Sequence, residues 1–303
     1  MKRFLFFMVM VLATVPMPAA ESEGLPPSAG PTPSLGQLMA SLPAARSARS
    51  TEGIVLGSGY GFESQLLVPV VIRAAGKNGT FFETDYFLVN GRGAAQDILI
   101  GFLPAGVPGA TQPTQRFSLA ANTSYSITDF LGGGTGRLNL SGVGSLLVTG
   151  VFTGSSNMDT NAQLYGAARI WTMEPGSTGT NSFTEWAVAP GVIHGSGESI
   201  VIGARQNTDF RANYGLVNLD IINSRTWTID VRTAGGGSVQ TTATIPPLSM
   251  GQVAVPSSLV PGSNGYLIFN FTPSLSTDFP WYAFGTSADN ITGDAWYSVG
   301  IQF

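Results

Sequence analysis

Asp and Asn side chains gather at two places where they could bind calcium, which prefers oxygen ligands closely spaced on a loop. One group consists of Asp289, Asn290 and Asp294. A second group consists of Asn157, Asp159 and Asn161. The spacing is not that of an EF-hand, because the required Gly and the closing Glu are missing. Since Asp and Asn also form ordinary turns through side-chain bonds to backbone amides, the sequence favours turns and leaves calcium as the alternative.

Two carboxylates on one face of a strand could do the acid–base work of glycoside hydrolysis. Glu83 and Asp85 alternate in this way within a stretch expected to form one strand. A related stretch later in the chain carries Arg211 and Asn213 at the matching positions, so the acid pair is not repeated. A solvated strand face therefore explains these carboxylates better than a catalytic pair does.

Other kinds of catalytic site have little support in the sequence. His194 is the only histidine, and it lies in a Gly-rich stretch beside Ser196 and Glu198. A Ser-His-acid site needs a firmly held nucleophile, but no Gly-x-Ser-x-Gly elbow occurs in the chain. Glu185 is a further single acid. Cysteine is absent, which excludes thiolate nucleophiles, thiolate metal sites and disulfides. We therefore expect a protein that is not an enzyme, with no catalytic residues and no cofactor.

Aromatic rings at the surface could bind a ligand by stacking on sugar rings. Trp171 and Trp186 are the candidate residues, and they are expected to face each other across a hairpin. Trp281, Tyr282 and Trp296 are further aromatic candidates. Because Trp is commonly a core residue in β-sandwiches, the sequence favours core packing for each of them and leaves ligand stacking as the alternative.

The composition limits the possible partners. Only 11% of the 303 residues are charged, the net charge is −4, and Lys2 and Lys77 are the only lysines. Without a basic stripe the chain cannot neutralise nucleic-acid phosphates, so nucleic acid is not an expected partner. The expected partner is an unknown protein or glycan at the cell surface.

The elements that must position all these side chains are β-strands. The stretch FFETDYFLVN, residues 81–90, returns in altered form as DFRANYGLVN, residues 209–218. At a spacing of 128 residues, Phe82 aligns with Phe210 and Tyr86 aligns with Tyr214. Each copy alternates aromatic or β-branched residues with polar ones and ends on an Asn, as a strand before a turn does. The 39 glycines and 19 prolines supply turn signals between further short strands. A repeat of this length indicates two homologous domains rather than a solenoid.

We therefore predict an all-β protein with two tandem immunoglobulin-like β-sandwich domains, at residues 54–190 and 191–303. Pro69 lacks an amide donor, so its strand should lie at a sheet edge or carry a bulge. Residues 137–140 are expected to form a strand. Residues 164–189 should form a long hairpin that completes the first domain or bridges the two. Residues 155–162 look like a partial echo of residues 289–294, with Phe152 aligned to Phe284 and Asn157 to Asp289.

The N-terminal region looks like an export signal followed by a tether. Residues 1–20 begin with Lys2 and Arg3 and continue in an apolar run, which predicts a signal peptide; a retained membrane anchor is the alternative. No later stretch is apolar and long enough to span a membrane. Residues 21–53, rich in Pro, Ser, Ala and Gly, are expected to be a disordered linker. Within it, residues 35–42 could form either a fleeting helix or a short docking helix.

Short motifs in both copies carry a resemblance to a known group. They are Pro69-Val70-Val71, FETD at 82–85, LVN at 88–90 and again at 216–218, and DNITGD at 289–294. These motifs resemble those of uncharacterised secreted bacterial proteins with tandem immunoglobulin-like β-sandwich modules. The resemblance covers residues 66–303, although Gly91 and Leu219 stand where the group often has Pro. It implies the fold and no established catalytic residues.

We expect a secreted, periplasmic or cell-surface bacterial protein that acts as a non-catalytic structural or adhesion-like binding module. The alternative function is that of a carbohydrate-binding module or a glycan hydrolase using paired carboxylates.

Overall fold

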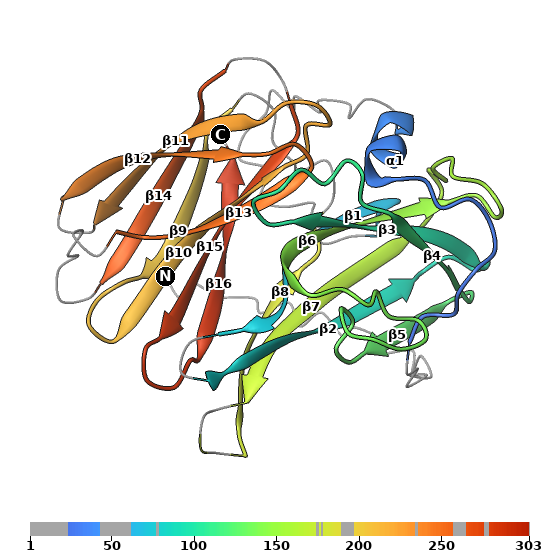
Figure 1. Ribbon diagram of the computed structural model, residues 1–303, viewed down its shortest axis with the longest axis horizontal. Coiled ribbons are helices and arrows are strands. Elements are labelled where there is room, and N and C mark those ends of the chain that lie inside the picture. Colours follow the sequence, from blue (N-terminus) through green and yellow to red (C-terminus); the bar gives the residue numbers. More distant parts are fainter. Residues whose placement is uncertain are drawn as a thin grey trace, which may run out of the picture.

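The structure is a computed structural model that describes residues 24–42, 62–76, 79–173, 176, 178–188, 197–233, 236–256, 265–275 and 279–302. The expected signal peptide and His194 lie outside the described residues. Strands dominate the described part, which holds one helix, α1 (Leu35–Ser41) (Figure 1). No described helix is long and apolar enough to cross a membrane. The prediction of an all-β fold is confirmed.

The first half of the chain forms one eight-stranded antiparallel sheet that folds over into two layers of a β-sandwich. Its strands are β1 (Gln65–Ala75), β2 (Phe81–Asn90), β3 (Gln96–Pro104), β4 (Thr114–Leu119), β5 (Thr123–Ile127), β6 (Gly142–Val151), β7 (Leu164–Met173) and β8 (Thr180–Trp186). One layer has the order β4-β3-β6-β1 and the other β5-β2-β7-β8. The end of β1 joins the layers, because Ala74 and Ala75 pair with β2.

The second half forms another eight-stranded antiparallel sheet. Its strands are β9 (Ser199–Arg205), β10 (Phe210–Asn218), β11 (Arg225–Thr233), β12 (Ser238–Ile245), β13 (Ser249–Ala254), β14 (Tyr266–Pro273), β15 (Trp281–Asp289) and β16 (Ala295–Gln302). The layers run β12-β11-β14-β9 and β13-β10-β15-β16, so the first half's order recurs with eight added to each strand number. Here β16 joins the layers by pairing with β9 as well as β15.

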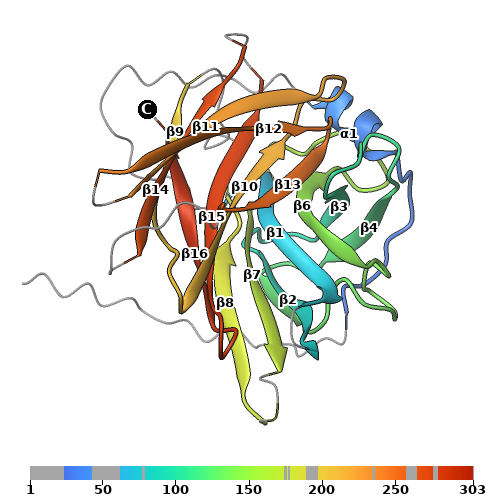
Figure 2. The ribbon, with the colours of Figure 1, turned by 60° about the vertical axis from the view of Figure 1, so that its left-hand side comes forward.

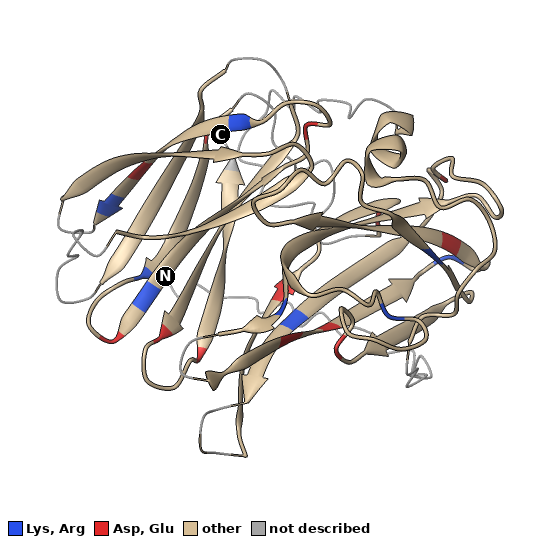
Figure 3. Cartoon of the chain, viewed as in Figure 1, with Lys and Arg blue, Asp and Glu red and all other residues tan. Residues whose placement is uncertain are grey.

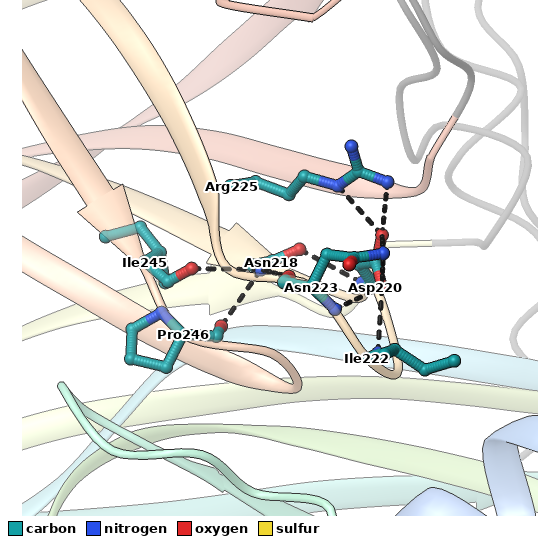
Figure 4. A network of polar contacts seen from close by, with 7 residues as sticks. All are labelled: Asn218, Asp220, Ile222, Asn223, Arg225, Ile245 and Pro246. Atoms are coloured by element: carbon teal, nitrogen blue, oxygen red, sulfur yellow. Dashed lines mark hydrogen bonds and ion pairs between the residues drawn. The ribbon is translucent and has the colours of Figure 1, made fainter.

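The two strands with similar sequences, β2 and β10, each end in a polar network, and the two networks have the same pattern of hydrogen bonds. The buried side-chain Nδ2 of Asn218 donates to the backbone carbonyl oxygens of Asn223, Ile245 and Pro246 at 3.0, 3.0 and 2.9 Å (Figure 4). The side-chain Oδ1 of Asn218 accepts from the backbone N–H of Asp220 at 3.0 Å. Asn90 does the same in the first half.

In the first-half network, the Asn90 amide donates to Ala94 O and Ala120 O at 2.9 and 2.8 Å, and its Oδ1 accepts from the Arg92 amide at 3.0 Å. Each Asn thus ties the end of its strand to the turn that follows and to a later loop. That role explains why an Asn ends both strands.

The same two strands place matching aromatic side chains in the cores. Tyr86 and Tyr214 are both buried. The Tyr86 ring stacks on Phe130 with ring centres 5.1 Å apart, and the Tyr214 ring packs against Phe269 at 5.7 Å. The partner rings come from different elements, so the two cores share the central tyrosine and not its neighbours.

The two halves pack through a shared apolar core. We call the outer face of β10, β13 and β15 the contact face; its buried side chains are Val217, Met250, Tyr282 and Phe284. They belong to the same hydrophobic cluster as first-half residues from β1, β3 and β6. Figure 2 shows β13 beside β6 of the first half.

Backbone hydrogen bonds reinforce this junction. Gly106 N donates to Met250 O at 3.0 Å, and Ser249 Oγ donates to Pro104 O at 2.7 Å. Gly215 is required on the contact face, since a Cβ there would lie 2.0 Å from a Phe284 ring carbon. The second half therefore completes the core of the first.

Residues 24–42 correct the expectation of a disordered linker. Leu25, Leu35 and Leu38 are buried, and α1 begins with a capping box formed by Ser34 and Gln37. Leu35 N donates to Gln112 O at 2.8 Å, which ties the helix to the first half. The linker interpretation was wrong here because these leucines find a surface to bury on, a tertiary effect that local composition does not reveal. The docking-helix alternative is the one observed.

Of the two alternatives predicted for the strand of Pro69, an edge position or a bulge, the bulge is observed. The register between β1 and β6 shifts between Val68 and Val71, and β1 lies inside the sheet rather than at its edge. Because the shift takes the Val70 amide out of the ladder, that N–H donates instead to Glu185 Oε1 at 2.9 Å. Ser145 Oγ donates to the Pro69 carbonyl at 2.5 Å.

Two finer expectations are corrected. Residues 137–140 form no strand; Leu138 N and Leu140 N bond instead to Phe130 O and Leu131 O within a loop. Residues 155–162 lie between β6 and β7, whereas residues 289–294 join β15 to β16, so neither the loops nor the alignments of Phe152 with Phe284 and Asn157 with Asp289 correspond. The hairpin of β7 and β8 does complete the first sheet, as predicted.

Candidate functional site

A row of aromatic side chains lies on the outer face of β2, β7 and β8, and we call it the aromatic row: Phe62, Phe87, Tyr165 and Trp186. Phe62, Phe87 and Trp186 are 51%, 38% and 46% exposed. The Tyr165 ring lies 6.3 Å from Phe62 and 5.7 Å from Trp186, centre to centre. Phe87 on β2 and Trp186 on β8 both pair with the small Ala167, which lies between them on β7. The arrangement is an open, largely apolar sheet face.

Strand alternation places these rings outward. Tyr86 and Leu88 are fully buried, so Phe87 between them must point away from the core. Trp186 was a candidate from the sequence, but Phe62, Phe87 and Tyr165 were missed. The alternation of Phe81, Glu83, Asp85 and Phe87 could have identified Phe87, whereas the approach of Phe62 and Tyr165 depends on the fold.

Trp171 and Trp186 do not face each other, which corrects that expectation. Trp171 pairs with Ser182, and Trp186 pairs with Ala167, so the two rings lie at different points along the hairpin. Trp171 is half-buried, and its indole N–H donates to Asp85 Oδ1 at 3.0 Å. Trp171 thus has a structural hydrogen bond, and Trp186 is the exposed member of the pair.

The acid pair proposed from the sequence is divided between two environments. Asp85 is 7% exposed, and its Oδ1 also accepts from the Asp129 amide at 3.1 Å. Arg169 approaches its Oδ2 at 3.7 Å. Glu83 is partly exposed; desolvation raises its pKa, and the Asp129 carboxylate raises it further. Asp85 is thus held by three neighbours, unlike a carboxylate free to exchange protons with a substrate.

The remaining candidate acids are far apart in the fold. Glu185 shares the inner face of its sheet with Ala168 and Tyr86, opposite to the face that carries Asp85. Glu198 is exposed in the second half, where it accepts from Thr272 Oγ1 at 3.2 Å. Figure 3 shows the charged residues scattered over both halves, with most of the strand length uncharged. No group of three or more acidic or metal-ligating side chains suited to a metal occurs among the described residues.

The Asp289 hairpin is built as a turn. Asp289 Oδ1 accepts from the Ile291 and Thr292 amides at 2.7 and 2.8 Å, and these hydrogen bonds, the Thr292 bond foremost, lower the pKa of its carboxyl. The Asn290 side-chain Nδ2 donates to Thr208 O at 3.1 Å, and Asp294 Oδ1 accepts from the Ala295 backbone N–H at 3.0 Å. These hydrogen bonds form the turn that the sequence favours at this position.

We expect calcium chelation to leave the melting temperature unchanged, because backbone amides already occupy the Asp289 oxygen that a cation would need. Asp289→Ala should lower the melting temperature with or without EDTA, since it removes both amide bonds, and Asp289→Asn should lower it less. Differential scanning fluorimetry in the presence of CaCl₂ or EDTA checks this. A melting temperature that rises with calcium in the wild type but not in Asp289→Ala would contradict it.

A pocket of about 150 Å³ lies between the halves, where the contact face turns from apolar to polar. The first half contributes apolar Ile72, Phe82 and Phe183 to its wall, and the second half contributes polar Arg211, Asn213 and Gln252, among others.

The polar wall of this pocket has hydrogen-bonding capacity to spare. Gln252 Nε2 donates to Thr286 Oγ1 at 3.0 Å, and Arg211 Nη1 donates to Asn290 Oδ1 at 3.2 Å. These bonds use one nitrogen of each side chain. Arg211 and Gln252 therefore keep polar atoms that a hydroxylated ligand could engage, opposite aromatic rings that could contact its apolar side.

No protein-family model matches this chain, and the comparison with curated proteins finds no match. Two solved structures of a lectin from Pleurotus ostreatus align over most of it. The complex with GalNAc is 10% identical, with a TM-score of 0.11, and the alignment covers 82% of this chain and 84% of the lectin chain. The apo form is 12% identical, with a TM-score of 0.12, covering 83% and 84%. At these TM-scores the likeness carries no argument about fold or function.

Proposed function

We propose that the protein is a non-catalytic, adhesion-like binding module, exported by a bacterium to the periplasm, cell surface or medium. The observation that carries this proposal is the aromatic row. Monomeric proteins rarely leave several large aromatic rings together on a flat face, and such rings are the residues that dominate binding energy at interfaces. The row is therefore the surface on which we place the partner, an unknown protein or glycan.

The state of the acidic residues supports a role without catalysis. A glycosidase needs two carboxyl groups that flank one bond at a separation of roughly 5–10 Å, one of them free to give or take a proton. Asp85 is held by Trp171, Arg169 and the Asp129 amide, and Glu185 lies on the opposite face of the sheet. Of the pair proposed from the sequence, Asp85 is therefore not free to act as a proton donor or acceptor, which weakens the case for a glycosidase.

The recurring strand order supports a further part of the proposal, that two homologous domains arose by duplication. The same order of neighbouring strands occurs within the layers of both halves. The hydrogen bonds of Asn90 at the end of β2 match those of Asn218 at the end of β10. We propose the immunoglobulin-like type for both domains on the motif resemblance, and export on the signal-like residues 1–20.

A carbohydrate-binding module is the second candidate, and the pocket between the halves favours it. Aromatic Phe82 and Phe183 face polar Arg211 and Gln252 there, the combination that sugar rings require on their two sides. A glycan hydrolase using paired carboxylates lacks such support among the described acids.

Binding assays on row variants test the main proposal. In co-sedimentation with isolated bacterial envelopes, Phe87→Ser/Trp186→Ser should weaken retention at least about tenfold, because truncating an aromatic anchor removes 2 kcal/mol or more. Phe152→Ser is the matched control, since Phe152 is an equally exposed ring, 50%, outside the row. Retention that survives the row substitutions would refute the proposal.

The same variants separate the two candidates. In native gels containing soluble polysaccharides, the second candidate requires retardation that Arg211→Ala abolishes and the row substitutions leave intact. Loss of retardation in the row variant alone would instead place a glycan on the aromatic row.

A further inference from the structure

The aromatic row occupies the positions that the second half uses to bind the first. Asn90 pairs with Leu164, and Asn218 pairs with Trp281, so β2 matches β10 at a spacing of 128 residues and β7 matches β15 at 117. Phe87 and Tyr165 therefore correspond to Gly215 and Tyr282. The latter two are buried on the contact face, and Tyr282 belongs to the core shared with the first half, whereas Phe87 is 38% exposed.

The surface that receives the contact face also has a counterpart. In the first half, Phe82 and Phe183 line the junction with the second half, and the Phe183 ring stacks on Tyr297 at 6.3 Å. Strand registers equate Phe82 with Phe210 and Phe183 with Trp296, because Ile170 pairs with Phe183 as Ser287 pairs with Trp296.

In the second half these counterparts, Phe210 and Trp296, lie in an aromatic cluster with Arg205 and Tyr266, and we call the four residues the end cluster. Phe210 packs edge-on against Trp296 at 5.4 Å. The Arg205 guanidinium lies 4.2 Å from the Phe210 ring centre and 5.8 Å from that of Tyr266. Tyr266 is 50% exposed. The contact face and the surface around Phe82 and Phe183 join the two halves. The aromatic row and the end cluster are the corresponding surfaces that this junction does not use.

We propose that the aromatic row of one molecule binds the end cluster of a second copy of this chain, head to tail. The proposal rests on the proposed function, because it names the partner of the same row. The contact that joins the two halves would be repeated between molecules. Since the row and the end cluster are different surfaces, the interface is heterologous, and repeated use generates a ring or a filament rather than a twofold dimer.

The chemistry of the two surfaces suits such a contact. The row supplies aromatic faces, and the end cluster supplies aromatic edges and a guanidinium, which prefer tilted ring pairs and cation–π geometry. A low charge content, 11% of residues, limits repulsion between copies. The internal junction shows how such a face is buried, since Tyr282 and Phe284 are nearly or fully covered there.

Sedimentation velocity over a range of protein concentrations tests the proposal. The wild type should form larger species as concentration rises. Trp186→Ser removes the row and Tyr266→Ser removes the end cluster; each should weaken self-association at least about tenfold, and each replaces an exposed residue, so the melting temperature should be kept. Phe152→Ser should assemble like the wild type.

Mixing the two deficient variants gives the sharpest result. A Trp186→Ser molecule retains its end cluster, and a Tyr266→Ser molecule retains its row, so an equimolar mixture should form one-to-one dimers that grow no further. Assembly that is lost in Trp186→Ser but normal in Tyr266→Ser would overturn the proposal in favour of a row-to-row dimer. A wild type that stays monomeric at every concentration would also overturn it, and the proposed function would survive if row variants still lost envelope retention.

Discussion

Asn218→Ala is expected to lower the free energy of unfolding by about 3 kcal/mol or more. The substitution leaves three carbonyl oxygens without their donor, those of Asn223, Ile245 and Pro246, and removes the acceptor for the Asp220 amide. Asn218 is fully buried, and each buried polar group left unsatisfied costs about 1–3 kcal/mol. Urea denaturation followed by Trp fluorescence measures the loss.

The chain offers its own replicate and controls for this experiment. Asn90→Ala should cost a similar amount, because Asn90 makes the matching bonds at the end of β2. Asn218→Asp should be no milder than Asn218→Ala, since it would place a carboxylate against the three carbonyl oxygens. Asn161→Ala, at an exposed position, should stay within about 0.5 kcal/mol of the wild type. A loss below about 1 kcal/mol in both network variants would mean that water replaces the amide at little cost.

The strands were largely predictable because period and turn residues are local properties. The alternation in residues 81–90 marked β2, and its return marked β10 at the correct spacing. The missing amide of Pro69 predicted an edge strand or a bulge, and the structure has the bulge. The failures came where distant contacts decide the outcome. Arg116 holds the N-terminal stretch by donating to Pro31 O at 3.0 Å while paired with buried Asp97 at 3.0 Å, and neither contact is visible in local sequence.

The candidate site was less predictable than the fold for a related reason. A sequence shows that residues alternate, but it does not show which of two apolar faces meets a neighbouring unit. Tyr282 and Tyr165 occupy matching positions, yet one is buried at the junction and the other lines an open face. The difference arises from which face packs on the other half. Residue type alone could therefore nominate Trp186 but could not separate it from Trp281, which is buried in the second core.

Glu185 should make the protein less stable as the pH rises. Burial raises the pKa of its carboxyl well above 4.5, although the hydrogen bond from the Val70 amide opposes the shift. Its Oε2 has no hydrogen-bond partner within the described structure. Because the folded state holds the proton more tightly than the unfolded state, the contribution of Glu185 to stability is largest below pH 4.5. It then falls until the folded-state pKa is passed, by at most about 1.4 kcal/mol per pH unit.

Glu185→Gln should remove this dependence, since Gln is neutral at every pH and its carbonyl can still accept from Val70. The variant should match the wild type near pH 4 and become the more stable protein as the pH rises, when both are unfolded by urea at a series of pH values. Subtracting the two curves cancels other titrating groups, such as Asp220, whose pKa is lowered on folding.

Glu198→Gln, an exposed substitution, is the control and should leave the pH dependence of the wild type intact. A difference between wild type and Glu185→Gln that stays constant with pH would mean that the Glu185 carboxyl has the same pKa in the folded and unfolded states and is ionised in the folded protein at neutral pH. The carboxylate would then have to find a second donor in place of the unpaired Oε2, and the bulge at Pro69 would be held by a charge instead of a neutral acid.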